Sequence, residues 1–168
     1  SNAPVYVSRI WLRFLPHYGL PSMERFVGVP DEGMHCEVTP GFHLDLLPAH
    51  FLHSEGQINV YDPVSRILFT GDIGAAMMPE GEDTPFVDDF HAHLPYIEGF
   101  HRRYMASNRA TRLWVDMVSK LPIDMIAPQH GPVYRGPAVA AFLDWFRHLE
   151  CGVDLMEAAG RFRGAVYA

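Results

Sequence analysis

The sequence has few cysteines and no long apolar run, and each shortage excludes a class of protein. Two cysteines in 168 residues, Cys36 and Cys151, cannot form a disulfide framework, so a reduced, cytoplasmic chain is expected. The longest apolar runs, such as residues 67–69, are far too short to cross a bilayer, and no signal peptide is recognisable. The sequence therefore predicts neither a disulfide-rich secreted domain nor a membrane protein.

Basic residues are also scarce, and several catalytic motifs are missing. The 13 Lys and Arg residues against 20 Asp and Glu residues give a formal charge of -7, which argues against a nucleic-acid partner and a polybasic membrane patch. The sequence has no glycine-rich phosphate loop and no Gly-x-Ser-x-Gly motif, and Cys151 has no histidine-rich context that would activate a thiol. We therefore expect no organic cofactor and no serine or cysteine nucleophile.

Histidine is the residue whose abundance points to chemistry. Ten histidines in one small acidic chain favour a metal site, since imidazole is the commonest metal ligand. The length and the 48% hydrophobic content predict one globular domain. Ser1-Asn2-Ala3 resembles the remnant of a cleaved tag, so the domain is assigned to residues 4–168. A strand is expected directly afterwards, which indicates that the chain begins within a larger native protein.

The pattern of apolar residues, caps and turns predicts mixed strands and helices, and hence an α/β or α+β class. The expected strands are residues 5–7, 26–29, 35–38, 42–46, 58–61, 67–70 and 123–127. The expected helices are residues 10–18, 89–108, 108–120, 137–148 and 152–160, while residues 77–88 are expected to be a loop.

Three polar residues lie at or near the ends of predicted strands, each with a glycine within three residues. His53 precedes the hairpin of residues 58–70, Asp72 ends that hairpin, and His130 follows the strand of residues 123–127. Ligand sites in sheet proteins gather in such loops, and glycine lets the backbone approach a ligand closely. Two imidazoles and one carboxylate suit zinc, iron or manganese. The alternative for each residue alone is an ordinary surface, core or turn role.

The stretches around these residues resemble the second half of the metallo-β-lactamase fold, an αββα sandwich. The resemblance is carried by His53-Ser54-Glu55-Gly56, Leu68-Phe69-Thr70-Gly71-Asp72 and Ala127-Pro128-Gln129-His130-Gly131-Pro132. Residues 60–76 are similar to the di-iron branch, which holds flavodiiron proteins and stand-alone oxygen-binding di-iron proteins. The resemblance implies that His53 binds a first metal, that Asp72 bridges two metals, and that His130 binds the second.

One motif of the family is absent. Its remaining ligands come from His-x-Glu-x-Asp-His in the di-iron branch, or His-x-His-x-Asp-His in most hydrolases, and neither occurs here. His91-Ala92-His93 is the part of the sequence most similar to this motif. His91 and His93 are therefore additional candidate ligands. The alternatives are surface residues, or residues that contact the ligands without binding the metal. With only the second half of the fold, three donors are too few to hold two metals tightly. We therefore expect a weak, partial or empty site, and a homodimer or swapped oligomer that covers the exposed sheet.

Three functions remain open. The first is a di-iron protein that binds dioxygen, or that reduces oxygen or nitric oxide, with two non-haem irons and with electrons from a partner protein, because no flavin domain is present. The second is a di-zinc hydrolase of an ester, thioester or amide. The third is a metal-free interaction module in which His53, Asp72 and His130 are relics.

Overall fold

A seven-stranded mixed sheet forms the centre of the molecule. The computed structural model describes residues 2–20, 22–82 and 84–158. The strand order is β3-β4-β5-β6-β8-β9-β7, with β6 parallel to β8, β7 parallel to β9, and the other pairs antiparallel. The strands are β3 (Met34–Thr39), β4 (Phe42–Pro48), β5 (Ile58–Asp62), β6 (Ile67–Gly71), β7 (Phe86–Val87), β8 (Met125–Pro128) and β9 (Val133–Arg135).

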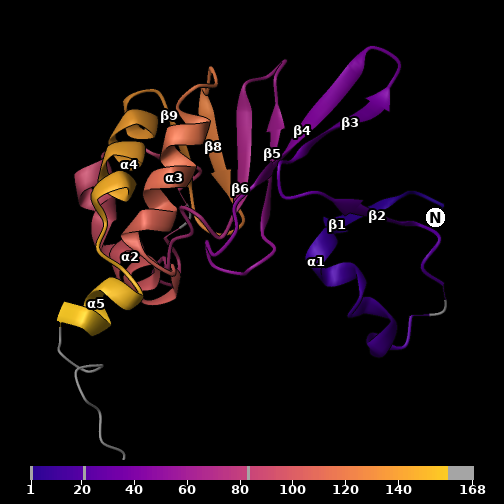
Figure 1. The fold of residues 1–168 in the computed structure, drawn as a ribbon. Helices are drawn as coiled ribbons and strands as arrows, with labels where there is room; N and C mark the ends of the chain where they lie inside the picture. Colours follow the sequence, from indigo (N-terminus) through magenta and orange to yellow (C-terminus); the bar gives the residue numbers. More distant parts are fainter. Residues whose placement is uncertain (1, 21, 83, 159–168) are drawn as a thin grey trace, which may run out of the picture.

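Three helices cover one face of this sheet (Figure 1). They are α2 (Phe90–Tyr104), α3 (Asn108–Val118) and α4 (Pro137–His148), followed by the short α5 (Val153–Ala158). The side chains of Asp89 and Ser107 accept hydrogen bonds from backbone N–H groups and so cap α2 and α3. Between helices and sheet lies the main core, to which β5, β6 and all three helices contribute.

The N-terminal segment covers part of the opposite face. It contains β1 (Val5–Ser8), α1 (Arg9–Leu12), the 3-10 helix η1 (Leu15–Tyr18) and β2 (Phe26–Val29), with β1 and β2 paired in parallel. The alternation of side chains in β5 explains the two cores: Tyr61 belongs to the helix-side core, whereas Val60 packs against a smaller cluster of Val29, Cys36 and Leu46. A helix layer, a large sheet and a small second sheet are therefore present.

Several predicted boundaries were wrong for identifiable reasons. The single helix at residues 10–18 is divided into α1 and η1, because Pro16 lacks the N–H that a continuing α-helix needs. The loop predicted at residues 77–88 contains β7, and β9 was not predicted at all. Residues 30–33, by contrast, form a turn in which the N–H of Gly33 donates to the carbonyl of Pro30, and this turn connects β2 of the small sheet with β3 of the large sheet.

The long helices also end earlier than predicted. Helix α2 ends at Tyr104 instead of residue 108, because Met105 is extended and Ser107 begins the next helix. The predicted helix at residues 152–160 corresponds to α5, and its last two positions lie outside the described residues. Within the described ranges, no helix combines the length and the apolar character needed to span a bilayer.

The sheet face away from the helices carries an exposed aromatic side chain. Phe69 in β6 is 45% exposed, while its neighbours Leu68 and Thr70 are buried toward the helices. An exposed apolar side chain on a sheet face is a position at which another layer can pack. The homodimer or swapped oligomer expected to cover such a face remains a prediction.

Candidate metal centre

The three residues predicted to bind metal come together at one edge of the sheet. His53 lies between β4 and β5, Asp72 directly follows β6, and His130 lies between β8 and β9. Because β6 and β8 are parallel neighbours, their carboxyl ends deliver Asp72 and His130 to the same edge. The Nε2 atom of His53 is 2.9 Å from Oδ2 of Asp72, and Nε2 of His130 is 3.9 Å from Oδ1 of the same carboxylate.

A glutamine fixes the loop of His53 to the end of β6. Gln57 accepts a hydrogen bond from the backbone N–H of His53 (2.9 Å) through its amide oxygen. Its amide nitrogen donates to the carbonyl oxygen of Thr70 (3.0 Å), two residues before Asp72. One side chain therefore connects the loop of the first imidazole with the strand that carries the carboxylate.

Backbone hydrogen bonds join the loops of Asp72 and His130. The N–H of Gln129 donates to the carbonyl of Gly71 (2.7 Å), and the N–H of Ala76 donates to the carbonyl of His130 (3.2 Å). Gly131 has a φ of 85°, and a Cβ placed on it would lie 2.7 Å from the Cβ of Ala76. Only glycine fits this close approach, which explains the glycine after His130.

Two buried side chains hold the segment that follows Asp72. The N–H of Gly74 donates to Nε2 of His101 (2.8 Å), so the ring proton lies on Nδ1, which faces the carbonyl of Ile97 at 2.7 Å. Burial lowers the pKa of His101 to about 4, so this imidazole is neutral near pH 7. The hydroxyl of Tyr134 donates to the carbonyl of Gly74 (2.8 Å), and burial raises the pKa of this phenol.

The site is open to solvent on one side and aromatic on the other. The His53 ring lies 6.0 Å from the ring of Phe100 and 5.8 Å from that of Tyr104, both from α2. The side chains of His53, Asp72 and His130 are 37%, 27% and 64% exposed. The arrangement can therefore place two imidazoles and one carboxylate around ions that a small molecule can reach.

Comparison with known proteins gives the family. The model of a family described as ODP family beta-lactamase matches residues 1–131. The chain belongs to this ODP family. None of the curated proteins compared with it gives a match. Family membership confirms the predicted relation to the metallo-β-lactamase fold and to its di-iron branch.

Two solved structures of the chemotaxis sensor ODP are similar to this ODP-family chain. One, described as the peroxy diiron species, is 48% identical with a TM-score of 0.85 and covers 94% of this chain and 65% of that chain. The other, the apo state from T. denticola, is 48% identical with a TM-score of 0.87 and covers 94% and 64%. The chain thus spans somewhat less than two thirds of these relatives.

More distant structures show the fold alone. Rubredoxin oxygen:oxidoreductase from Desulfovibrio gigas is 12% identical, with a TM-score of 0.74, and the match covers 86% of this chain and 36% of that one. The flavodiiron protein from Giardia intestinalis is 18% identical, with a TM-score of 0.69, and covers 84% and 34%. The α/β metallo-β-lactamase-like architecture is therefore confirmed for part of the fold.

The two additional candidates, His91 and His93, lie on α2. His91 is exposed in the first turn, where its N–H donates to the cap residue Asp89. His93 is buried, its ring lies 5.6 Å from that of Tyr134, and burial lowers its pKa. Across the described ranges, neither histidine forms a hydrogen bond or ion pair with the three predicted ligands. A ligand role for either remains a prediction without a contact to support it.

Sequence reasoning missed the residues that position the ligands. Helix α2 buries Phe90, His93, Ile97 and His101, so two histidines occupy the stripe that packs against the core. This 3- to 4-residue spacing was the available signal for His101. No sequence signal indicates Gln57, because its two partners, His53 in a loop and Thr70 in β6, are brought together only by the fold.

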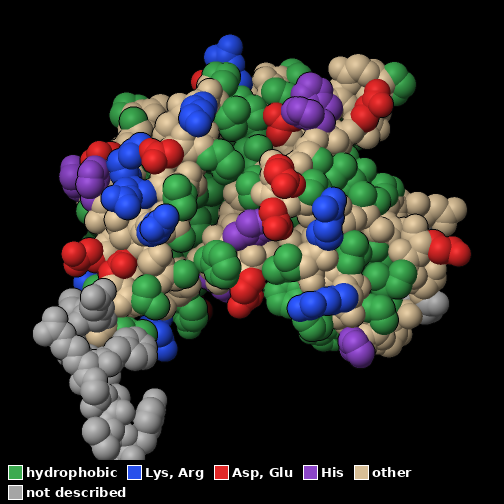
Figure 2. Space-filling view, in the orientation of Figure 1, with side chains coloured by type: hydrophobic (Ala, Val, Ile, Leu, Met, Phe, Trp, Pro, Cys, Tyr) green, Lys and Arg blue, Asp and Glu red, His purple; other side chains and the backbone are tan. Residues whose placement is uncertain are grey.

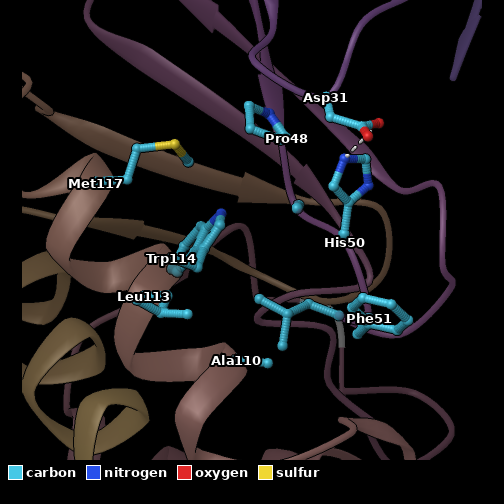
Figure 3. A pocket seen from close by; sticks show the side chains of 10 residues that line it. Asp31, Pro48, His50, Phe51, Ala110, Leu113, Trp114 and Met117 are labelled. Carbon is cyan, nitrogen blue, oxygen red and sulfur yellow. Dashed lines mark ion pairs between the residues drawn. The ribbon is translucent and has the colours of Figure 1, made fainter. Parts of the chain in front are cut away.

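A largely apolar cavity borders the loop of His53. It measures about 330 Å3 and lies between residues 48–52 and α3, with Trp114, Leu113 and Met117 on its helix side (Figure 3). His50 lines it, and its Nε2 atom is 3.4 Å from Oδ1 of Asp31. The cavity therefore offers mainly apolar contact beside the candidate metal centre.

Proposed function

We propose that this chain contributes His53, Asp72 and His130 to a non-haem di-iron centre that binds dioxygen in an oxygen sensor. The observation that carries the proposal is the orientation of the Asp72 carboxylate, whose two oxygens face two different imidazoles at 2.9 and 3.9 Å. A carboxylate so placed can bridge two cations while each imidazole binds one. A solved structure of the chemotaxis sensor ODP, which is 48% identical to this chain, is described as its peroxy diiron species. This supports iron as the metal and oxygen as the molecule that the metal binds.

The donor set fits a di-iron centre in part. Imidazole nitrogen and carboxylate oxygen suit iron, and the loops that carry them are already joined by hydrogen bonds. Three protein donors do not saturate two ions, so we infer that the remaining ligands come from protein outside these 168 residues. When bound, the irons supply the redox chemistry for dioxygen binding. The weak or partial binding expected of this chain alone follows from the missing donors.

The chain's own residues serve to position the ligands. Neutral His101 accepts the N–H of Gly74, and Tyr134 donates to the carbonyl of the same residue, so the segment after Asp72 is held from both sides. The two hydrogen bonds of Gln57 hold the loop of His53 in a similar way. The rings of Phe100 and Tyr104 limit water on one side of the His53 imidazole, while the other side stays open for a small gas. Such a site suits sensing, and a reductase role would require an electron-donor protein.

The test is anaerobic titration of the chain with Fe2+, followed by the histidine ring resonances in NMR. We expect paramagnetic broadening of His53 and His130 together, because both face one carboxylate. Asp72→Asn should abolish this paired broadening, while the matched control Asp144→Asn, an exposed helix carboxylate, should leave it unchanged. Admission of air should then alter the visible absorption only in proteins that retain Asp72.

Other outcomes would select other functions. Broadening at His53 and His130 that survives Asp72→Asn, or that occurs at only one of them, would contradict the bridging role. Turnover of an ester by the zinc-loaded chain would favour the di-zinc hydrolase. Failure of the chain to bind either metal at these residues, even in a longer protein that supplies the missing donors, would favour a metal-free interaction module.

A further inference from the structure

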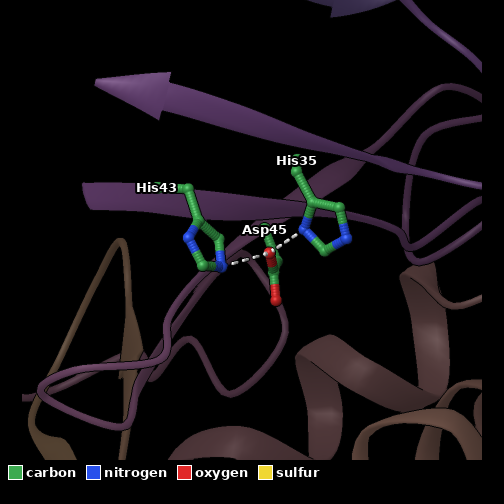
Figure 4. Close-up of side chains that lie close together, drawn as sticks. All are labelled: His35, His43 and Asp45. Atoms are coloured by element: carbon green, nitrogen blue, oxygen red, sulfur yellow. Dashed lines mark hydrogen bonds and ion pairs between the residues drawn. The ribbon is translucent and has the colours of Figure 1, made fainter. Parts of the chain in front are cut away.

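We propose that His35, His43 and Asp45 form a separate binding site for a divalent transition metal, such as Zn2+, on the face of the β3–β4 hairpin that points away from the smaller core. One ligand atom from each residue lies within 4.8 Å of the other two. The carboxylate Oδ1 of Asp45 is 2.5 Å from Nδ1 of His35 and 3.7 Å from Nε2 of His43. Figure 4 shows the carboxylate between the two imidazoles.

The register of the hairpin places these side chains on one face. His35 in β3 is directly opposite Asp45 in β4, and Glu37 is directly opposite His43. Because side chains alternate along a strand, all four point to the same side of the hairpin. The intervening residues Cys36 and Leu44 point the other way, and Cys36 belongs to the smaller core. The backbone therefore fixes the donors as a group.

The electrostatics favour a cation between these groups. The Asp45 side chain is only 17% exposed, and within the described part of the chain its ion-pair partners are the two histidines alone. Among the described residues, no lysine or arginine forms an ion pair with this carboxylate. A divalent ion would supply a positive charge and would use nitrogen and oxygen donors that zinc prefers.

The geometry leaves room for a metal and a fourth ligand. Zinc bonds of about 2.0 to 2.2 Å in a tetrahedral site place neighbouring donors roughly 3.3 Å apart, which rotation of the exposed His35 and His43 side chains can reach. A cleft of about 400 Å3 lies beside them, lined by Glu37, Gly41 and Phe42 as well. Histidine and acidic side chains gather on this accessible surface over the hairpin (Figure 2). Water or Glu37 can complete the coordination.

Metal binding here would join two strands at an edge of the sheet. His35 belongs to β3, the edge strand, whereas His43 and Asp45 belong to its neighbour β4. An ion held by both strands stabilises their pairing, since a ligand that binds only the folded state shifts the folding equilibrium. The site therefore couples metal availability to the stability of the hairpin, independently of the centre at Asp72.

The experiment is calorimetric titration with Zn2+ of a chain carrying His53→Ala and His130→Ala, so that the other centre cannot contribute. We expect one zinc ion per chain. His43→Ala and Asp45→Asn should each weaken binding by more than about tenfold, because even the loss of a group that only supports a ligand often has this effect. The matched control is His148→Ala, which removes an exposed imidazole 3.6 Å from the Asp144 carboxylate.

A second measurement protects the test from a folding defect of the double variant. In the unmodified chain, substoichiometric Zn2+ should shift the ring resonances of His35 and His43 together and leave His148 in place. Unchanged affinity in His43→Ala, equal weakening in His148→Ala, or resonances of His35 and His43 that do not respond to Zn2+ would each overturn the proposal.

Discussion

The buried imidazole of His101 makes the stability of this protein depend on pH in a calculable way. Its pKa is lowered from 6.5 to about 4 by burial in the fold. Between these values the unfolded chain binds a proton that the folded chain does not, so the stabilisation is complete above pH 6.5 and is lost as pH falls toward 4. From about pH 7 to about pH 4.5 this single group removes about 2 kcal/mol from the free energy of unfolding.

The perturbation that isolates this effect is His101→Gln. The glutamine amide oxygen can still accept the N–H of Gly74, but the side chain does not titrate. Urea unfolding at the two pH values, followed by tryptophan fluorescence, should show about 2 kcal/mol less pH dependence in the variant than in the unmodified chain. His148→Gln, at an exposed position, should keep the full dependence. Equal pH dependence in His101→Gln and the unmodified chain would refute the reasoning.

Three further predictions concern the scaffold. Gly152→Ala should lower the free energy of unfolding by more than about 3 kcal/mol, since a Cβ there meets two backbone oxygens at 2.2 and 2.3 Å, whereas Gly19→Ala, with open space, should cost about 1 kcal/mol in the same urea assay. Asn59→Leu should cost about 2 kcal/mol by urea unfolding, because it leaves the buried indole N–H of Trp114 without its acceptor, while the carbonyl of Thr70 keeps its hydrogen bond from Gln57. Burial raises the pKa of Cys151 to about 12, so iodoacetamide should alkylate this thiol only in urea, as read by peptide mass spectrometry.

Each of these predictions has a clear contrary outcome. Equal losses for Gly152→Ala and Gly19→Ala would mean that contact with the backbone oxygens is not what excludes a side chain at residue 152. A loss below about 1 kcal/mol for Asn59→Leu would mean that its two hydrogen bonds contribute little to stability. Rapid alkylation of Cys151 in the folded protein would mean that the thiol is neither buried nor protonated as described.

Elements with strong local signals were predictable from sequence. The β5–β6 hairpin follows from alternating apolar residues around Asp62 and Pro63, and α2, α3 and α4 follow from Asp89, Ser107 and Pro137 at their first turns. Strands β7 and β9 were not predictable, because two and three residues give no periodicity and their stability comes from pairing with each other and with β8.

The same distinction applies to the site. His53, Asp72 and His130 were identifiable because strand ends and neighbouring glycines are visible in the sequence. The supporting roles of His101 and Gln57 were not, since each also bonds a group that is distant in sequence, Gly74 at 27 residues and Thr70 at 13 residues, and these contacts depend on tertiary packing. The hairpin cluster was missed for another reason: strands were predicted at residues 35–38 and 42–46, but not the antiparallel pairing that places His35 beside Asp45.

The two hydrogen bonds of Gln57 affect how the loop of His53 would bind an ion. Because this loop is already tied to the carbonyl of Thr70, it loses its conformational freedom when the chain folds rather than when a ligand arrives. Capture of an ion then requires little ordering of the backbone, and its departure leaves the His53 loop in place. In the proposed di-iron centre, oxidation or exchange of a bound metal would then proceed without unfolding of this edge of the sheet.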